Sequence, residues 1–146
     1  MSPPQDRELF CTTIRVRYAE TDTMGIAYYA NYLVWFEVAR TEFLREHGLP
    51  YRELEESGIY LPVGEAGARM MRPAFYDDEL QVSCWIGELR SRSIRLEYEI
   101  ARPENGTGVV IIATGFTTLV STSRDRRPQS FSPELRKRLE NLGPRP

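Results

Sequence analysis

The sequence has few residues of the kinds that carry most enzyme chemistry. Among 146 residues there is one histidine, His47, and there are two cysteines, Cys11 and Cys84. His47 falls at the carboxyl end of a predicted helix, where a favourable interaction with the helix dipole is its expected role. Without another histidine, a Ser-His-Asp triad or a Cys-His dyad would have no general base, and a zinc site would have too few soft ligands. We therefore predict no metal or other cofactor, and a carboxylate as catalyst if the protein is an enzyme.

Features of several other protein classes are also missing. Two cysteines make no disulfide framework, and no glycine-rich stretch fits a dinucleotide or P-loop pattern. The start, MSPPQDREL, is polar and no apolar run could span a bilayer, so we expect no signal peptide and a cytoplasmic location. The formal net charge of -2 gives no large field favouring nucleic acid or a membrane, and neither is an expected partner. The basic stretch at 123–127 is expected to be a solvated loop.

The composition is that of a globular protein. Hydrophobic residues make up 41% of the chain and charged residues 27%, and the length is enough for a hydrophobic core without disulfides. We find no internal repeat and no linker, so residues 1–146 are expected to form one domain.

The longest predicted element is a helix from about residue 29 to residue 46. Its apolar stripe recurs at helical spacing through Tyr32, Phe36, Ala39 and Phe43. The sequence HGLP at 47–50 ends this helix. Shorter helices are predicted at about 51–58 and at 132–142.

Most of the remaining chain is predicted to form strands. In the first, residues 10–18, we expect Ile14, Val16 and Tyr18 on the buried face. The other predicted strands are 59–71, 79–89, 93–102 and 108–122, separated by turn-forming segments. Strands with one apolar and one polar face suit an antiparallel sheet that packs on the long helix. The predicted fold class is α+β.

Asp22 lies in TDTMG at 21–25, directly ahead of the long helix. Its side chain could fold back onto the nearby backbone as an Asx-turn. Alternatively, the carboxylate lies beside free N–H groups at the helix start, where the dipole is positive. There the N–H groups can polarise a carbonyl while the carboxylate attacks it or activates water, which makes an acyl-transfer site. The residues themselves leave both interpretations open.

Glu37 is a second carboxylate within the long helix. It forms an ion pair, with Arg40 of the helix or with Arg15 or Arg17 of the first strand, or it takes part in function. The aromatic residues around it are expected in the core and in subunit contacts: Tyr28, Tyr29, Tyr32 and Trp35.

This region resembles a known signature. Asp22-x-x-Gly25, the Tyr28-Tyr29 pair, ANYLVWFE at 30–37 and ARTEFL at 39–44 look like the hotdog-fold acyl-CoA thioesterases of the 4-hydroxybenzoyl-CoA thioesterase type. The similarity continues through PAFYDDELQV at 73–82 and covers roughly residues 12–122. In that fold a curved five-stranded antiparallel sheet wraps a long central helix, which agrees with the element order above. The resemblance implies hydrolysis of an acyl-CoA to a free acid and CoA.

By this resemblance Asp22 takes the place of the catalytic carboxylate, as nucleophile or general base, and the backbone N–H of Tyr29 that of the oxyanion donor. Many relatives carry histidine at or beside position 29, and a phenol with a pKa near ~10 is not an equivalent base. The expected substrate-binding residues are Gly25, Tyr28 and Glu37, with Arg90, Ser91, Arg92 and Ser93 in a turn that meets CoA phosphates.

Two alternatives to a thioesterase remain: a non-catalytic acyl-CoA-binding hotdog protein, and a dehydratase, for which His47 is badly placed. We also expect a homodimer or homotetramer, because sheet edges and aromatics such as Tyr28, Trp35 and Phe36 are unsuited to solvent. The sequence does not name the acyl group.

Overall fold

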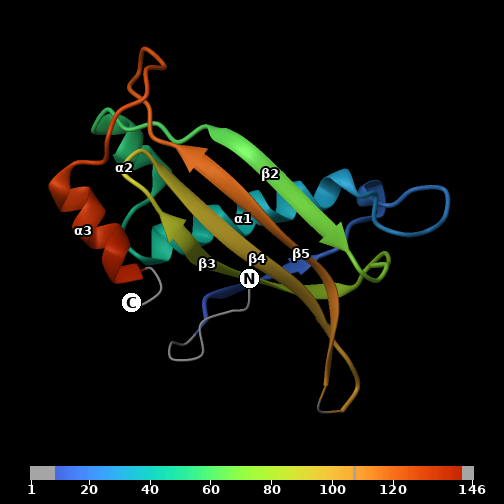
Figure 1. The fold of residues 1–146 in the computed structure, drawn as a ribbon. Helices are drawn as coiled ribbons and strands as arrows, with labels where there is room; N and C mark the ends of the chain where they lie inside the picture. The colour runs from blue at the N-terminus through green and yellow to red at the C-terminus, as the bar shows by residue number, and fades with distance from the viewer. Residues whose placement is uncertain (1–8, 107, 143–146) are drawn as a thin grey trace.

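A computed structural model describes residues 9–106 and 108–142 of the chain. In these residues a curved five-stranded antiparallel sheet wraps around one long helix, and two shorter helices lie at one end of the sheet (Figure 1). This arrangement confirms the predicted α+β class and the predicted pairing of the long helix with a curved sheet. No helix in the described ranges has both the length and the apolar character needed to cross a membrane.

The sheet has the strand order β1-β3-β4-β5-β2, so that β1 and β2 are its edges. All neighbouring strands pair antiparallel. The strands are β1 Cys11–Arg15, β2 Val63–Met70, β3 Glu79–Leu89, β4 Ser93–Pro103 and β5 Val109–Val120. The helices are α1 Ala30–Glu46, α2 Tyr51–Glu56 and α3 Pro133–Leu142.

Helix α1 packs its apolar stripe into the concave side of the sheet. The predicted stripe of Tyr32, Phe36, Ala39 and Phe43 is buried, which confirms the periodicity. Phe36 stacks on Tyr98 of β4 with ring centroids 4.4 Å apart. A Cβ atom at Gly115 of β5 would lie only 2.4 Å from the Phe36 ring, so a glycine is required where the helix comes closest to the sheet.

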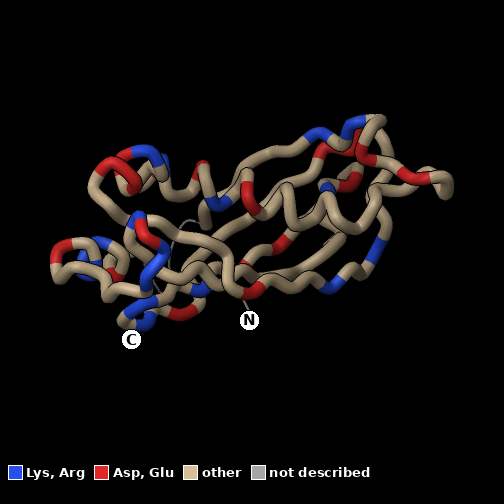
Figure 2. The backbone as a smooth tube through the Cα atoms, turned by 90° about the horizontal axis from the view of Figure 1, so that it is seen from above, with Lys and Arg blue, Asp and Glu red and all other residues tan. Residues whose placement is uncertain are grey.

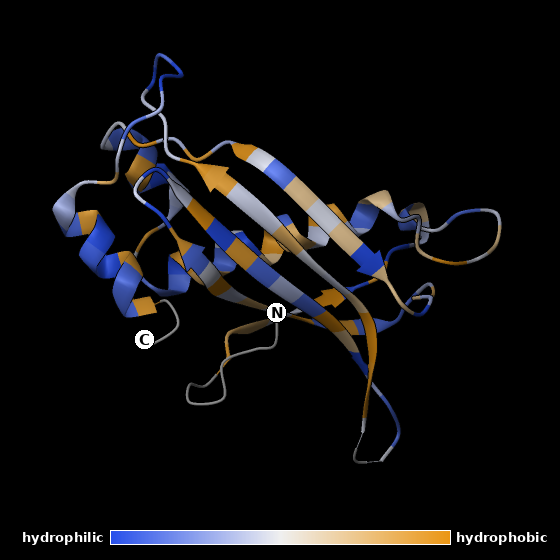
Figure 3. Cartoon of the chain, viewed as in Figure 1, coloured by the Kyte–Doolittle hydropathy of each residue, from blue (hydrophilic) through white to orange (hydrophobic). Residues whose placement is uncertain are grey.

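The two faces of the central strands follow the predicted alternation. On β4 the side chains of Ile94, Leu96, Tyr98 and Ile100 are buried, and polar positions alternate with them along the ribbon (Figure 3). Glu97, on the other face, is also buried, and it accepts a hydrogen bond from Arg95 at 2.7 Å.

The prediction for residues 10–18 is wrong at its end. Strand β1 stops at Arg15, and a 3-10 turn, η1, occupies Tyr18–Glu20. Val16 is buried as expected and forms backbone hydrogen bonds with Asp77 and Asp78. Beyond it the chain turns out of the sheet, so that Tyr18 is 79% exposed. The predicted strand 59–71 likewise begins later, at Val63.

Trp35 and Phe36 do not need a second chain to cover them. Both are buried within the chain itself, because they lie on the face of α1 that meets the sheet and the loop before it. The expectation that they would otherwise be left to solvent is therefore wrong, whereas Tyr28 is 48% exposed as that expectation requires.

Candidate active site

Asp22 lies in a loop that forms a short antiparallel ladder ahead of α1. The N–H of Tyr28 donates to the carbonyl of Glu20 at 2.8 Å, and the N–H of Asp22 donates to the carbonyl of Ile26 at 2.9 Å. The turn between them closes through the N–H of Gly25, whose φ of +78° lies in the region that favours glycine. This ladder ties the turn that carries Asp22 to the beginning of the helix; the loop extends from one end of the molecule (Figure 1).

The carboxylate of Asp22 is half-buried, and its two oxygens have different surroundings. Oδ1 accepts a hydrogen bond from the N–H of Met24 at 2.9 Å, which is the Asx-turn considered from the sequence. Within the described residues Oδ2 accepts no hydrogen bond. One oxygen therefore holds the turn, and the other is open for contact with a ligand.

The start of α1 supplies open backbone donors. The N–H groups of Asn31 and Tyr32 bond to the carbonyls of Tyr28 and Tyr29 in the first turn. Neither the N–H of Tyr29 nor that of Ala30 has an acceptor among the described residues. Unpaired N–H groups at a helix start, with the positive dipole end behind them, can hold a developing oxyanion.

Glu20 organises this region, and the sequence analysis missed it. Its carboxylate is almost fully buried, accepting hydrogen bonds from the Trp35 indole at 2.9 Å and from the Arg17 N–H at 2.9 Å. Burial of Glu20 opposes its ionisation, but these bonds and the Arg17 guanidinium together lower its pKa below the ordinary value. The sequence offers one sign of this role, an acid two residues before Asp22. The hydrogen bond to Trp35 could not be predicted, because Trp35 lies 15 residues further along the chain.

We expect Glu20→Gln to lower the free energy of unfolding at pH 7 by about 1–3 kcal/mol, the cost of impairing buried charge-assisted hydrogen bonds. A lowered folded-state pKa means that this stabilisation is complete above the unfolded-state pKa of about 4.3 and is lost as pH falls through the folded-state value. Urea unfolding at pH 7 and at pH 3 should show a smaller difference between wild type and variant at pH 3. An equal difference at both pH values would contradict this role for the charge.

Glu37 lies exposed on α1, and its predicted ion pairs are wrong. Arg40 is buried and donates instead to the hydroxyl of Tyr51 at 2.7 Å. Arg15 pairs with Glu79, and Arg17 pairs with Glu20. In the described part of the chain Glu37 has no ion-pair partner, which leaves its carboxylate free for a ligand.

The turn of Arg90, Ser91, Arg92 and Ser93 lies at the opposite end of the sheet from Asp22. Arg15, at the end of β1, pairs with Glu79, the first residue of β3, whereas the turn follows Leu89, the last. An eleven-residue strand separates its two ends by roughly 33 Å. A single chain therefore does not bring Asp22 and the turn together (Figure 1). Arg90 pairs with Glu88 at 3.0 Å, and Arg92 has no ion pair among the described residues.

Two further arginines lie at the same end as this turn. The carbonyl of Arg92 accepts a hydrogen bond from the N–H of Ser121, just before the basic stretch 123–127. There Arg124 and Arg126 line a cavity of about 590 Å³, and Arg124 donates to the hydroxyl of Tyr60 at 3.3 Å. Several basic positions, interspersed with acidic ones, gather near this end (Figure 2). The prediction of a solvated loop at 123–127 is confirmed, because residues 124–127 are all exposed. The cavity was not predicted, because it depends on residues near position 60.

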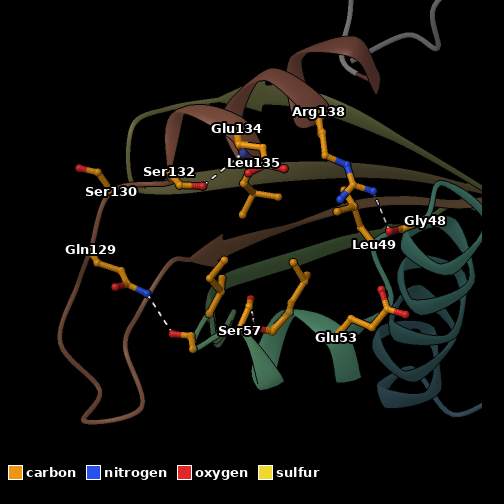
Figure 4. A pocket seen from close by; sticks show the side chains of 13 residues that line it. Gly48, Leu49, Glu53, Ser57, Gln129, Ser130, Ser132, Glu134, Leu135 and Arg138 are labelled. Atoms are coloured by element: carbon orange, nitrogen blue, oxygen red, sulfur yellow. Dashed lines mark hydrogen bonds between the residues drawn. The ribbon is translucent and has the colours of Figure 1, made fainter.

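A second cavity, of about 510 Å³, lies between α2 and α3 and holds none of the predicted site residues (Figure 4). Arg138 reaches across it to the carbonyl of Gly48 at 2.8 Å. His47 precedes Gly48 in the chain, and its Nδ1 lies 2.7 Å from the carbonyl oxygen of Phe43. It lies at the end of α1 that is far from Asp22. No group of three His, Cys, Asp or Glu side chains in residues 9–106 and 108–142 is arranged to hold a metal ion.

Comparisons with known proteins show the family to which the chain belongs. Residues 16–139 match the family model of the thioesterase-like superfamily. YneP of Bacillus subtilis is 40% identical over 90 residues, which are 62% of this chain and 65% of YneP, so the chain spans slightly less than two thirds of that relative. The acyl-CoA thioesterase YbgC of Haemophilus influenzae is 30% identical over 134 residues, 91% of this chain and 96% of YbgC.

Among solved structures, the DHNA-CoA thioesterase of Staphylococcus aureus superposes with a TM-score of 0.83 at 30% identity, covering 92% of this chain and 90% of that one. The chain belongs to the thioesterase-like superfamily. The predicted resemblance to the hotdog-fold acyl-CoA thioesterases, and with it the class of thioester hydrolase, is thereby confirmed.

Proposed function

We propose that the protein hydrolyses an acyl-CoA thioester to a free acid and CoA, with Asp22 as the catalytic carboxylate. The observation that carries the proposal is the open Oδ2 of Asp22, on a turn tied by backbone hydrogen bonds to a helix start with two open N–H groups. A carboxylate and oxyanion donors on one rigid loop are the minimum that thioester hydrolysis requires.

In this mechanism the oxygen of the thioester carbonyl accepts a hydrogen bond from the N–H of Tyr29. The positive end of α1 stabilises the negative charge that develops on this oxygen. Asp22 either attacks the carbonyl carbon, giving a mixed anhydride that water then opens, or removes a proton from an attacking water. Gly25 keeps the turn closed, while Tyr28 and Glu37 are exposed near the helix start and along α1, where an acyl group can contact them.

The substrate's CoA moiety requires a second copy of the chain. Asp22 and the arginine turn lie at opposite ends of one sheet, so we propose that Arg90, Ser91, Arg92 and Ser93 of one chain bind the phosphates of a CoA whose thioester meets Asp22 of another. The edge strand β2 supports such pairing, because it is exposed along most of its length and carries the apolar Val63 and Met70. A homodimer, or a tetramer built from two, satisfies this geometry.

Release of free thiol from a panel of acyl-CoAs, followed with a thiol reagent, tests the proposed function. The panel should include short, long and aromatic acyl groups. We expect at least one to be hydrolysed well above background. Background rates throughout, with tight binding of the same compounds, would favour the non-catalytic acyl-CoA-binding protein, in which Asp22 only closes its turn.

We expect the double variant Arg90→Ala/Arg92→Ala to raise KM for CoA thioesters by about tenfold or more, because phosphates lose charge-assisted hydrogen bonds. The N-acetylcysteamine thioester of the same acid has no phosphates and should be little affected. The matched control Arg52→Ala removes an exposed arginine of α2 and should change neither substrate. Equal losses on both substrates would assign the two arginines to folding or catalysis instead.

A further inference from the structure

Cleavage of a thioester leaves a thiolate that must acquire a proton. An alkyl thiol has a pKa of roughly 8.5, so a nearby acid assists its departure at neutral pH. The one histidine of the chain, His47, lies at the other end of α1, roughly 27 Å from residue 29 along the helix. An acid from the chain that carries Asp22 has to be another residue type near the helix start.

Two tyrosines occupy that position. Tyr28 and Tyr29 are 48% and 61% exposed, and their ring centroids are 4.7 Å apart. A hydrogen bond with Tyr29 is the main cause that raises the pKa of Tyr28 above its ordinary value, which agrees with the close approach of the two rings. Each phenol can donate or accept this bond, and when Tyr28 donates it, the hydroxyl hydrogen of Tyr29 is available to a ligand.

We propose that the phenol of Tyr29 is the general acid that protonates the leaving thiolate, an inference that rests on the proposed function. Tyr29 also carries one of the two open N–H groups, so the residue offers one donor for the carbonyl oxygen and another for the sulfur.

The proton balance closes without a further reactant. When the tetrahedral intermediate collapses, the C–S bond breaks, sulfur takes the electron pair, and the phenol proton passes to sulfur to give the free thiol. If Asp22 is the general base, the phenolate regains its proton through solvent from the carboxyl group of Asp22, which received one from the attacking water. If Asp22 is the nucleophile, the water that opens the anhydride supplies that proton. A phenol and an alkyl thiol differ in pKa by only about 1.5 units, so the transfer is close to balanced.

The test compares leaving groups in Tyr29→Phe. One acyl group is joined to CoA, to N-acetylcysteamine and to an aryl thiol of the nitrothiophenol type, whose thiolate departs without a proton. We expect kcat for the two alkyl thioesters to fall by about 10²-fold and that for the aryl thioester to stay within about threefold of wild type. Tyr28→Phe should show the same pattern with smaller losses, because it removes the supporting hydrogen bond.

Tyr76→Phe is the matched control, since it deletes the hydroxyl of another exposed, ring-paired tyrosine. It should leave both kinds of thioester unchanged. Equal losses of Tyr29→Phe on alkyl and aryl thioesters, or no loss on either, would overturn the proposal. Failure of the proposed function would give a different result, because the wild-type protein itself would then hydrolyse no acyl-CoA in the panel.

Discussion

Asp22→Asn is expected to fold normally and to lose at least ~100-fold in turnover of its best acyl-CoA, the scale of losing a nucleophile or general base. The asparagine Oδ1 can still accept a hydrogen bond from the N–H of Met24, so the turn and its backbone hydrogen bonds to the start of α1 are retained. What disappears is the charge and the basicity of the open oxygen Oδ2. Among the residues that the structure describes, no other acid is held at the helix start with an open oxygen, because the carboxylate of Glu20 already accepts hydrogen bonds from Trp35 and Arg17.

The measurement is kcat and KM for thiol release, with circular dichroism and thermal unfolding to verify the fold. Asp77→Asn is the matched control, because Asp77 is an exposed acid with a positive φ that asparagine also tolerates. It should retain near-normal turnover. Near-normal turnover in Asp22→Asn itself would remove the catalytic assignment and leave Asp22 as a turn residue.

The parts of the fold that were predictable depend on short-range patterns. The apolar stripe of α1 and the alternation of β4 can each be read within one element, because burial on one face imposes a fixed period. The end of β1 could not be read this way. Tyr18 continues the alternation, but backbone bonds of Val16 to residues 77 and 78 end the strand, and those residues come from another part of the chain.

The candidate site shows the same division. Asp22 and the N–H of Tyr29 are close in sequence, so their association could be inferred from the chain alone. The pairing of Glu20 with Trp35, and of Arg40 with Tyr51, joins elements that only tertiary packing brings together. Arg40 was therefore named as one possible partner of Glu37, its neighbour on the helix, although hydroxyl groups from α2 and from the sheet surround it.

Restoration of activity by mixing two defective chains is the second large effect that we expect. Asp22→Asn retains the arginine turn, and Arg90→Ala/Arg92→Ala retains Asp22. If each site combines Asp22 of one chain with the arginine turn of the other, a mixed dimer contains one site in which both are intact and one in which neither is. In a one-to-one mixture half of the dimers are mixed, so about a quarter of all sites should be intact. If both parts came from one chain, no mixed dimer would contain an intact site.

In the shared site that we propose, an acid at the start of α1 meets CoA held by the arginine turn of another copy. The most direct test is thiol release, at a CoA-thioester concentration well below the KM of the arginine variant, from the two variants refolded together. Differently tagged chains, captured as mixed assemblies, verify that subunits have exchanged. We predict recovery toward about a quarter of the wild-type rate. A mixture no more active than the mean of its parents, in spite of demonstrated exchange, would contradict the shared site.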